Sequence, residues 1–125
     1  MLVVLAATPA LADYNAGLAA NEKRDYATAL KEWQGAADQG DVRAWHGLGT
    51  LYLNGNGVRT DPRAASDWFR RAADKGYAES QFAYGQMLRD GNGIKADLPA
   101  AAALFLKAAL QKHASAQYAL ARLYE

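Results

Sequence analysis

GTLYLNGNGVRTDPRAASDWFRRAA, residues 49–73, returns as GQMLRDGNGIKADLPAAAALFLKAA at residues 85–109. Both copies begin with glycine, then carry a Gly-Asn-Gly loop, an aspartate followed within two residues by a proline, and a phenylalanine set between alanines. A fixed repeat of this length is typical of stacked helical hairpins, because a single hairpin cannot bury its apolar face alone. The chain is therefore expected to be all-α.

Each copy predicts one helical hairpin. Before the loop, Ala44, Leu48 and Leu51 recur at the spacing that places them on one helix face, and Ala65 and Phe69 do the same after it. The same positions in the other copies are predicted to be core as well: Ser80, Tyr84, Met87, Ala101, Phe105, Ala108, Ala116, Leu120 and Leu123.

The loops carry the more specific signals. Gly55 and Gly91 follow the first helix, where glycine adopts the left-handed conformation at little cost. Asp61 and Asp97 are expected to cap the second helix. A Gly-x-Gly pair can also bind phosphate, but here it recurs with the structural period and follows no strand, so it indicates hairpin geometry.

Composition narrows the class of function. The 125 residues include 14 basic and 13 acidic side chains, for a net charge of +1, and no cysteine. No basic block could contact a phosphate backbone, so a nucleic-acid partner is not expected. No apolar run approaches the roughly 20 residues of a membrane span.

The N-terminus reads as part of a secretory signal. Residues 1–7 are apolar, and Ala10-Leu11-Ala12 has the small-x-small form of a cleavage site. We expect residues 1–12 to be the remnant of a signal peptide and the protein to be periplasmic or secreted. The alternatives are an apolar helix packed on the first repeat and a cytoplasmic location.

The repeat units resemble a known superfamily. In the first unit Gly17 and Ala29 are 12 residues apart, whereas Gly49 and Ala65 are 16 apart. The short spacing resembles a tetratricopeptide repeat, and the long one, with Asn54-Gly55-Asn56-Gly57-Val58 and Trp68-Phe69-Arg70-Arg71-Ala72-Ala73, resembles the bacterial Sel1-like repeat. The resemblance implies a right-handed α-solenoid of antiparallel helical hairpins. Its units would be residues 13–40, 41–76 and 77–112, and residues 113–125 would be the first helix of a further repeat or a terminal cap, with a fragment of a longer protein favoured.

No residue pattern predicts chemistry. His46 and His113 are far apart, and neither has a second ligand one helical turn away, so no metal site is expected. No serine or threonine lies in a nucleophile motif. We predict a protein that is not an enzyme and that needs no cofactor.

The position of a residue relative to the repeated glycine, which we call its register, predicts a binding surface. In tetratricopeptide-like stacks the first helices line the concave face, and the position three before the repeated glycine points into it. Here that position holds one aromatic or imidazole side chain per repeat, which we call the aromatic ladder: Tyr14, His46, Phe82 and Tyr118. Asn21 and Arg89, four residues after the repeated glycines, and Arg122 are expected to be polar members of the same face. The ladder could grip a peptide, or it could pack neighbouring helices together.

The resemblance implies a non-catalytic scaffold that binds a protein or peptide on its concave face. The alternative is a cell-envelope glycan-binding module or an accessory to a peptidoglycan enzyme, which an exposed Trp45 in a groove would support. Trp33 and Trp68 are read as packing residues. The partner's identity and the oligomeric state leave no trace in the sequence.

Overall fold

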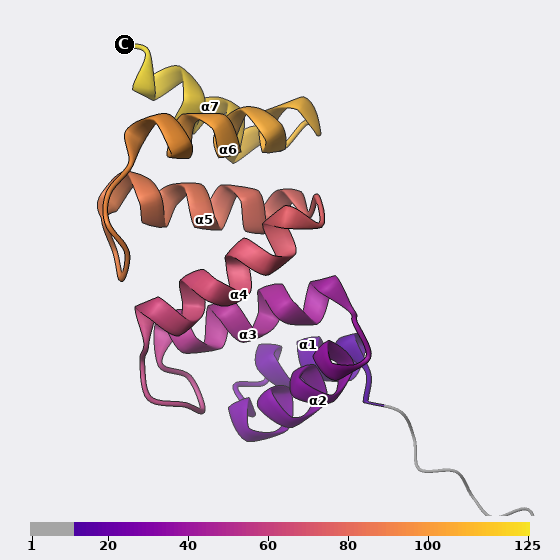
Figure 1. The fold of residues 1–125 in the computed structure, drawn as a ribbon. Helices are drawn as coiled ribbons and strands as arrows, with labels where there is room; N and C mark the ends of the chain where they lie inside the picture. The colour runs from indigo at the N-terminus through magenta and orange to yellow at the C-terminus, as the bar shows by residue number, and fades with distance from the viewer. Residues whose placement is uncertain (1–11) are drawn as a thin grey trace, which may run out of the picture.

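The computed structural model describes residues 12–125, and the predicted signal remnant therefore lies, apart from Ala12, outside the described residues. The described part contains helices and no strand (Figure 1). The helices are α1 (Tyr14–Glu22), α2 (Tyr26–Asp38), α3 (Val42–Asn54), α4 (Pro62–Asp74), α5 (Ala78–Asp90), α6 (Leu98–Leu110) and α7 (Ala114–Leu123).

The helices form a stack of hairpins. Helices α1 and α2, α3 and α4, and α5 and α6 pair through short loops, and each helix also contacts the next one along the chain, so that α7 packs on α6 (Figure 1). The odd-numbered helices are the first members of the hairpins, and the even-numbered helices are the second. The fold is thus an all-α helical-repeat solenoid, as expected.

Every hairpin is closed by one large ring packed on a glycine. Phe69 and Phe105 are buried, and a Cβ built on Gly49 or Gly85 would lie 2.6 Å from the nearest ring atom of its partner phenylalanine. A side chain at either glycine would therefore overlap a ring that has no room to move. The predicted core stripe of α3 (Ala44, Leu48 and Leu51) is fully buried, as are the alanines that flank each phenylalanine.

The predicted loop chemistry is confirmed. Gly55 and Gly91 end α3 and α5 with φ values of 69° and 68°, in the left-handed region. The side chains of Asp61 and Asp97 accept hydrogen bonds from the backbone N–H groups of residues 64 and 100, which satisfies donors that the first turn leaves unpaired.

Three predicted core residues are less buried than the register suggested. Tyr84, Leu120 and Leu123 are half-buried. Leu120 and Leu123 lie on α7, which packs on α6 but, within the described residues, has no second hairpin helix against its other side. Burial in a solenoid depends on both neighbours of a helix, and a sequence stripe reports only the helix itself.

Candidate interaction surface

The aromatic ladder joins each first helix to the start of the next one. The His46 ring lies 5.5 Å from that of Tyr77, and the Phe82 ring lies 4.9 Å from that of His113. Tyr77 and His113 are the residues immediately before α5 and α7. The register correctly placed these ladder side chains on one type of helix, but it did not show that each one contacts the next repeat.

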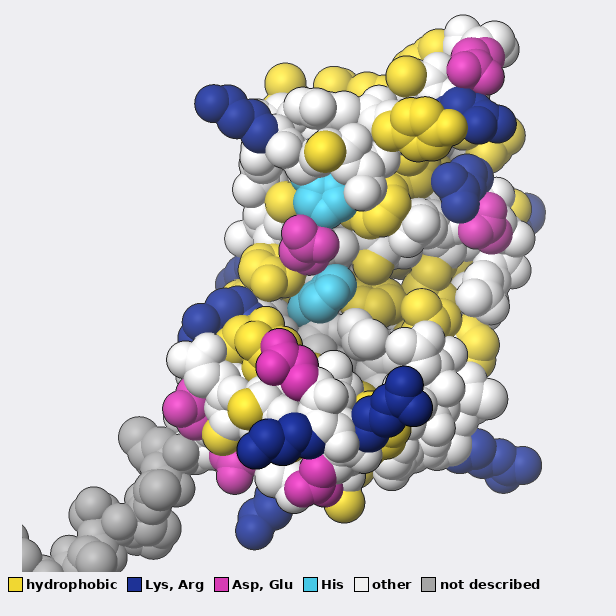
Figure 2. Space-filling model, turned by 180° about the vertical axis from the view of Figure 1, so that it is seen from behind, with side chains coloured by type: hydrophobic (Ala, Val, Ile, Leu, Met, Phe, Trp, Pro, Cys, Tyr) yellow, Lys and Arg dark blue, Asp and Glu magenta, His cyan; other side chains and the backbone are white. Residues whose placement is uncertain are grey.

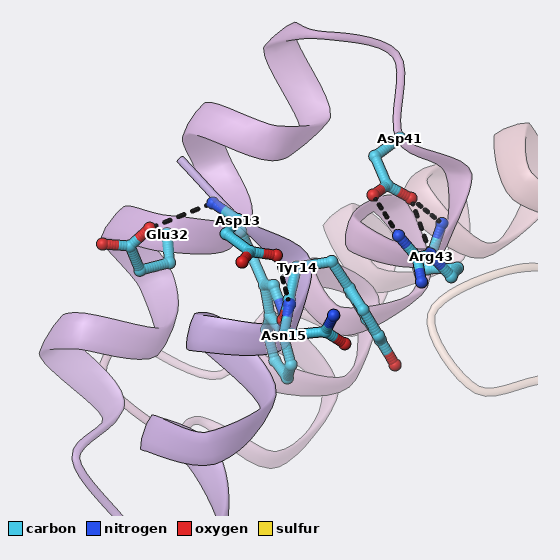
Figure 3. Close-up of polar contacts among 7 residues, drawn as sticks. Asp13, Tyr14, Asn15, Glu32, Asp41 and Arg43 are labelled. Carbon is cyan, nitrogen blue, oxygen red and sulfur yellow. Dashed lines mark hydrogen bonds and ion pairs between the residues drawn. The ribbon is translucent and has the colours of Figure 1, made fainter. Parts of the chain in front are cut away.

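Tyr14 makes the corresponding contact at the N-terminal end. Arg43 places its guanidinium 4.5 Å from the centre of the Tyr14 ring, and Asp41 holds that guanidinium through two hydrogen bonds (Figure 3). The hydrogen bond from Arg43 lowers the pKa of the Asp41 carboxyl below its usual value. The pair keeps a cation over the aromatic face, where the ring attracts it.

His46 is half-buried on the face where the register predicts the ladder. Its ring packs 5.1 Å from Phe69, and its Nδ1 lies 2.8 Å from the Ser80 hydroxyl. Burial lowers the pKa of His46 to about 4, although Glu79 acts in the opposite direction. His46 is therefore neutral near pH 7 and holds three helices, α3, α4 and α5, together.

His113 has a different role from His46. Its Nδ1 accepts the backbone N–H of Ala116 and caps α7, while its Nε2 lies 3.1 Å from Glu79. Both histidines are visible on one face, with an acidic side chain between them (Figure 2). Because Nδ1 accepts a hydrogen bond, the ring proton lies on Nε2, the ring atom that faces the Glu79 carboxylate. This capping role was not predicted, although the position of His113 before a helix was a usable signal.

A groove of about 800 Å³ lies between α5 and α7. Four of the seven residues predicted for the binding face line it: Phe82, Arg89, Tyr118 and Arg122. The other lining residues, which the register did not identify, are Gln86, Asp90, Ala114, Ser115, Ala119 and Leu123. Tyr14, Asn21 and His46 do not line it. We call this hollow the end groove.

The charges of the end groove are paired. Arg89 forms two hydrogen bonds with Asp90, and Arg122 lies 3.3 Å from Glu125 and donates to the Tyr118 hydroxyl. Exposed pairs of this kind contribute little stability. They do hold both guanidinium groups in defined places beside an apolar floor that includes Phe82. An acidic ligand would have to compete with the resident carboxylates.

Trp45 is half-buried, which removes the feature that favoured glycan binding. Its indole N–H donates to the Ala37 carbonyl at 3.1 Å. The residues at the same place in the later repeats, Gln81 and Gln117, donate in the same way to the carbonyls of Ala73 and Ala109. The side chain at this position thus anchors the first helix of a hairpin to the second helix of the hairpin before it. Tryptophan and glutamine both supply the required N–H. Trp33 is buried, in agreement with the packing role predicted for it.

Trp68 is half-buried and packs against the N-terminal core cluster. The guanidinium of Arg71 lies 4.7 Å from its ring centre and 4.8 Å from that of Trp45. The two indole rings are therefore occupied by a cation of the same chain.

Residues 12–125 contain neither a candidate metal cluster nor a helix that could span a membrane. No group of three or more histidine, cysteine, aspartate or glutamate side chains is placed to hold a metal ion there. None of the described helices is both long and apolar enough to cross a bilayer.

Sequence comparison identifies the repeats. The Sel1 repeat model matches residues 43–77, 78–113 and 114–125. The chain belongs to the Sel1 repeat family. Sel1 repeats generally mediate protein–protein interactions and typically form non-catalytic scaffolds. No curated protein sequence matches the chain.

Two solved bacterial structures are similar to this Sel1 repeat chain. The Sel1 repeat protein from Oxalobacter formigenes is 29% identical with a TM-score of 0.85, over 89% of this chain and 46% of that one. The protein c5321, a protective antigen of uropathogenic Escherichia coli strains, is 31% identical with a TM-score of 0.78, over 85% of this chain and 24% of that one. The chain thus spans less than half the length of either protein.

Proposed function

We propose that the chain is a non-catalytic scaffold that binds a peptide segment of a protein partner on its odd-numbered helices, with the end groove as the main contact. The observation that carries this proposal is the presence of four register-predicted residues in one hollow of about 800 Å³. A volume of that size is within the usual range for ligand sites.

The chemistry of the end groove favours a peptide with apolar and acidic side chains. Tyr118 is 65% exposed, so its ring is available to a ligand, whereas Phe82 forms part of the floor through its contact with Phe105. Tyrosine and arginine are the residue types that most often carry binding energy at interfaces. An acidic side chain of the peptide could exchange with Glu125 on Arg122.

The test is affinity capture from bacterial envelope extract with three baits. The first is the wild-type chain, the second carries Tyr118→Ala and Arg122→Ala, and the third carries Tyr124→Ala. Tyr124 is the matched control, because it is 78% exposed on the same terminal segment but does not line the groove. A protein held by the first and third baits and lost from the second supports the proposal. Equal capture by all three baits would refute it.

We also propose that the protein is exported to the periplasm or beyond. The support is the apolar start of the chain and the Ala10-Leu11-Ala12 sequence. The test is expression of the full chain in a bacterium, followed by fractionation and N-terminal sequencing. A mature protein that begins at Asp13 supports export, and a cytoplasmic protein that keeps Met1 contradicts it.

A further inference from the structure

The hairpin loops contain asparagines that are followed directly by glycine. Asn54-Gly55 lies at the end of α3, Asn56-Gly57 follows it in the same loop, and Asn92-Gly93 lies in the loop between α5 and α6. Asparagine is one of the thermolabile residues. It is least stable before glycine, because glycine has no side chain to keep its backbone nitrogen away from the asparagine carboxamide.

The reaction at such a pair is deamidation. The backbone nitrogen of the glycine loses its proton and attacks the carboxamide carbon of the asparagine, so that a new C–N bond forms and ammonia leaves. Water then opens the resulting five-membered succinimide at one of its two carbonyl carbons, which gives aspartate or isoaspartate. The net reaction consumes one water and releases one ammonia. It requires a glycine N–H that can lose its proton and an asparagine backbone that can turn.

The structure distinguishes the first pair from the other two. Asn54 is the last residue of α3, so its backbone is held in the helical conformation, and the N–H of Gly55 donates to the Leu51 carbonyl in the last turn of that helix. A hydrogen bond holds the proton on the nitrogen and fixes the nitrogen in place. Closing the succinimide ring at Asn54 would therefore break the last turn of α3.

The second and third pairs lack this protection. Asn56 and Asn92 lie outside the helices, in loops. Within residues 12–125 the N–H groups of Gly57 and Gly93 donate to no backbone carbonyl. Asn92 is exposed, whereas Asn56 is half-buried. We therefore expect Asn92 to react fastest, Asn56 next and Asn54 last.

The two unprotected glycines form part of the junctions between repeats. A Cβ built on Gly93 would lie 2.7 Å from the carbonyl carbon of Pro62, and one built on Gly57 would lie 2.9 Å from the Cβ of Tyr26. Pro62 and Tyr26 are the first residues of α4 and α2. Each glycine thus packs against the second helix of the hairpin before its own, and Figure 1 shows the loop after α5 reaching toward the start of α4.

We propose that Asn56 and Asn92 are sites of spontaneous deamidation, which modifies this chain as it ages and loosens the junctions between its repeats. Isoaspartate adds one methylene to the main chain directly before the glycine, so the glycine moves away from the helix on which it packs. The junctions affected are those of α2 with the α3–α4 loop and of α4 with the α5–α6 loop. This modification is independent of any ligand in the end groove.

The first test compares the three pairs in the folded and the unfolded chain. The full chain is incubated in mildly alkaline buffer with and without urea, and its tryptic peptides are then followed by mass spectrometry. Cleavage after Arg43, Arg59, Arg89 and Lys95 places Asn92 in a peptide of its own, and fragmentation separates Asn54 from Asn56. In urea all three pairs should react at similar rates.

Folding should slow the reaction at Asn54 several-fold more than at Asn56 or Asn92. Because all three residues precede glycine, this difference reports the folded structure and not the dipeptide. The same degree of slowing at all three asparagines would overturn the proposal, and so would a faster reaction at Asn54 than at Asn92 in the folded chain.

The second test concerns the junctions between repeats. Asn56→Gln/Asn92→Gln removes both sites, since glutamine would have to close a six-membered ring, which forms far more slowly. The matched control Asn54→Gln changes the protected asparagine and keeps both reactive ones. After incubation, the wild type and the control should melt several degrees below their fresh forms, whereas the double variant should be unchanged. Equal melting temperatures of the fresh and incubated wild type would overturn the effect on the junctions, as would an equal loss in the double variant.

Discussion

Acidification is expected to weaken the junction between α3, α4 and α5, because it charges His46. In the unfolded chain histidine titrates near 6.5, whereas burial lowers the pKa of His46 to about 4 in the folded protein. Between these two pKa values the unfolded state binds a proton that the folded state does not. Stability is therefore complete above about pH 6.5 and falls as the pH falls toward 4.

The size of the effect follows from the two pKa values. A difference of about 2.5 pH units corresponds to about 3 kcal/mol once the pH is below both values. At about pH 5.5, where the folded state is still mostly neutral, the loss is about 1.4 kcal/mol. That loss is measurable against the total of about 5–15 kcal/mol that stabilises an ordinary domain.

The assay is urea unfolding, followed by circular dichroism, of the wild type and of His46→Gln at about pH 7.5 and about pH 5.5. Glutamine does not titrate and can still bond to Ser80. The two proteins share every other ionisable group, so the contribution of those groups cancels in the comparison. The wild type should lose about 1.4 kcal/mol more than the variant. Equal losses in both proteins would show that His46 does not carry the pH dependence.

Three further predictions concern stability, measured by thermal unfolding. Gly49→Ala should lower the free energy of unfolding by about 1–3 kcal/mol, because the new Cβ overlaps the Phe69 ring. Adding Phe69→Leu to this variant should recover part of that loss. If stability does not recover, the overlap with Phe69 is not the cause. Asp61→Ala should lower the free energy of unfolding by about 1 kcal/mol, because the helix cap is lost. The control Asp67→Ala, on the exposed face of α4, should leave it almost unchanged. Equal effects of the two substitutions would contradict the capping role. Phe82→Ala should lower the melting temperature by several degrees, since the ring packs on its neighbours, and an unchanged value would assign Phe82 to ligand binding alone.

The hairpins were predictable because their signals are local. A helix cap such as Asp61 acts on an N–H three residues away, and a glycine such as Gly55 sets the conformation of its own backbone. Local requirements of this kind recur with the period of the repeat, so comparing two copies was enough to identify them. The aromatic ladder was predictable from the positions of the repeated glycines together with the resemblance to tetratricopeptide-like stacks.

The surroundings of the ladder were not predictable to the same depth. His46 is half-buried because Tyr77 and Ser80, more than 30 residues later in the chain, pack against it. Trp45 is the one aromatic residue at a position that holds glutamine in the later repeats, yet its hydrogen bond to Ala37 is the one that glutamine makes there. The sequence shows a change of residue type at that position, and only the packed structure shows that the interaction is the same.

By itself, the sequence determined the all-α class, the repeat, the helix ends and the apolar stripes, because these depend on interactions within a few residues. The tertiary structure alone decided how far each stripe is buried and which ladder residues meet in the end groove. Those properties depend on how helices of different repeats pack together, through contacts such as those of His46 with Tyr77 and of Phe82 with His113, which no single segment of the sequence encodes.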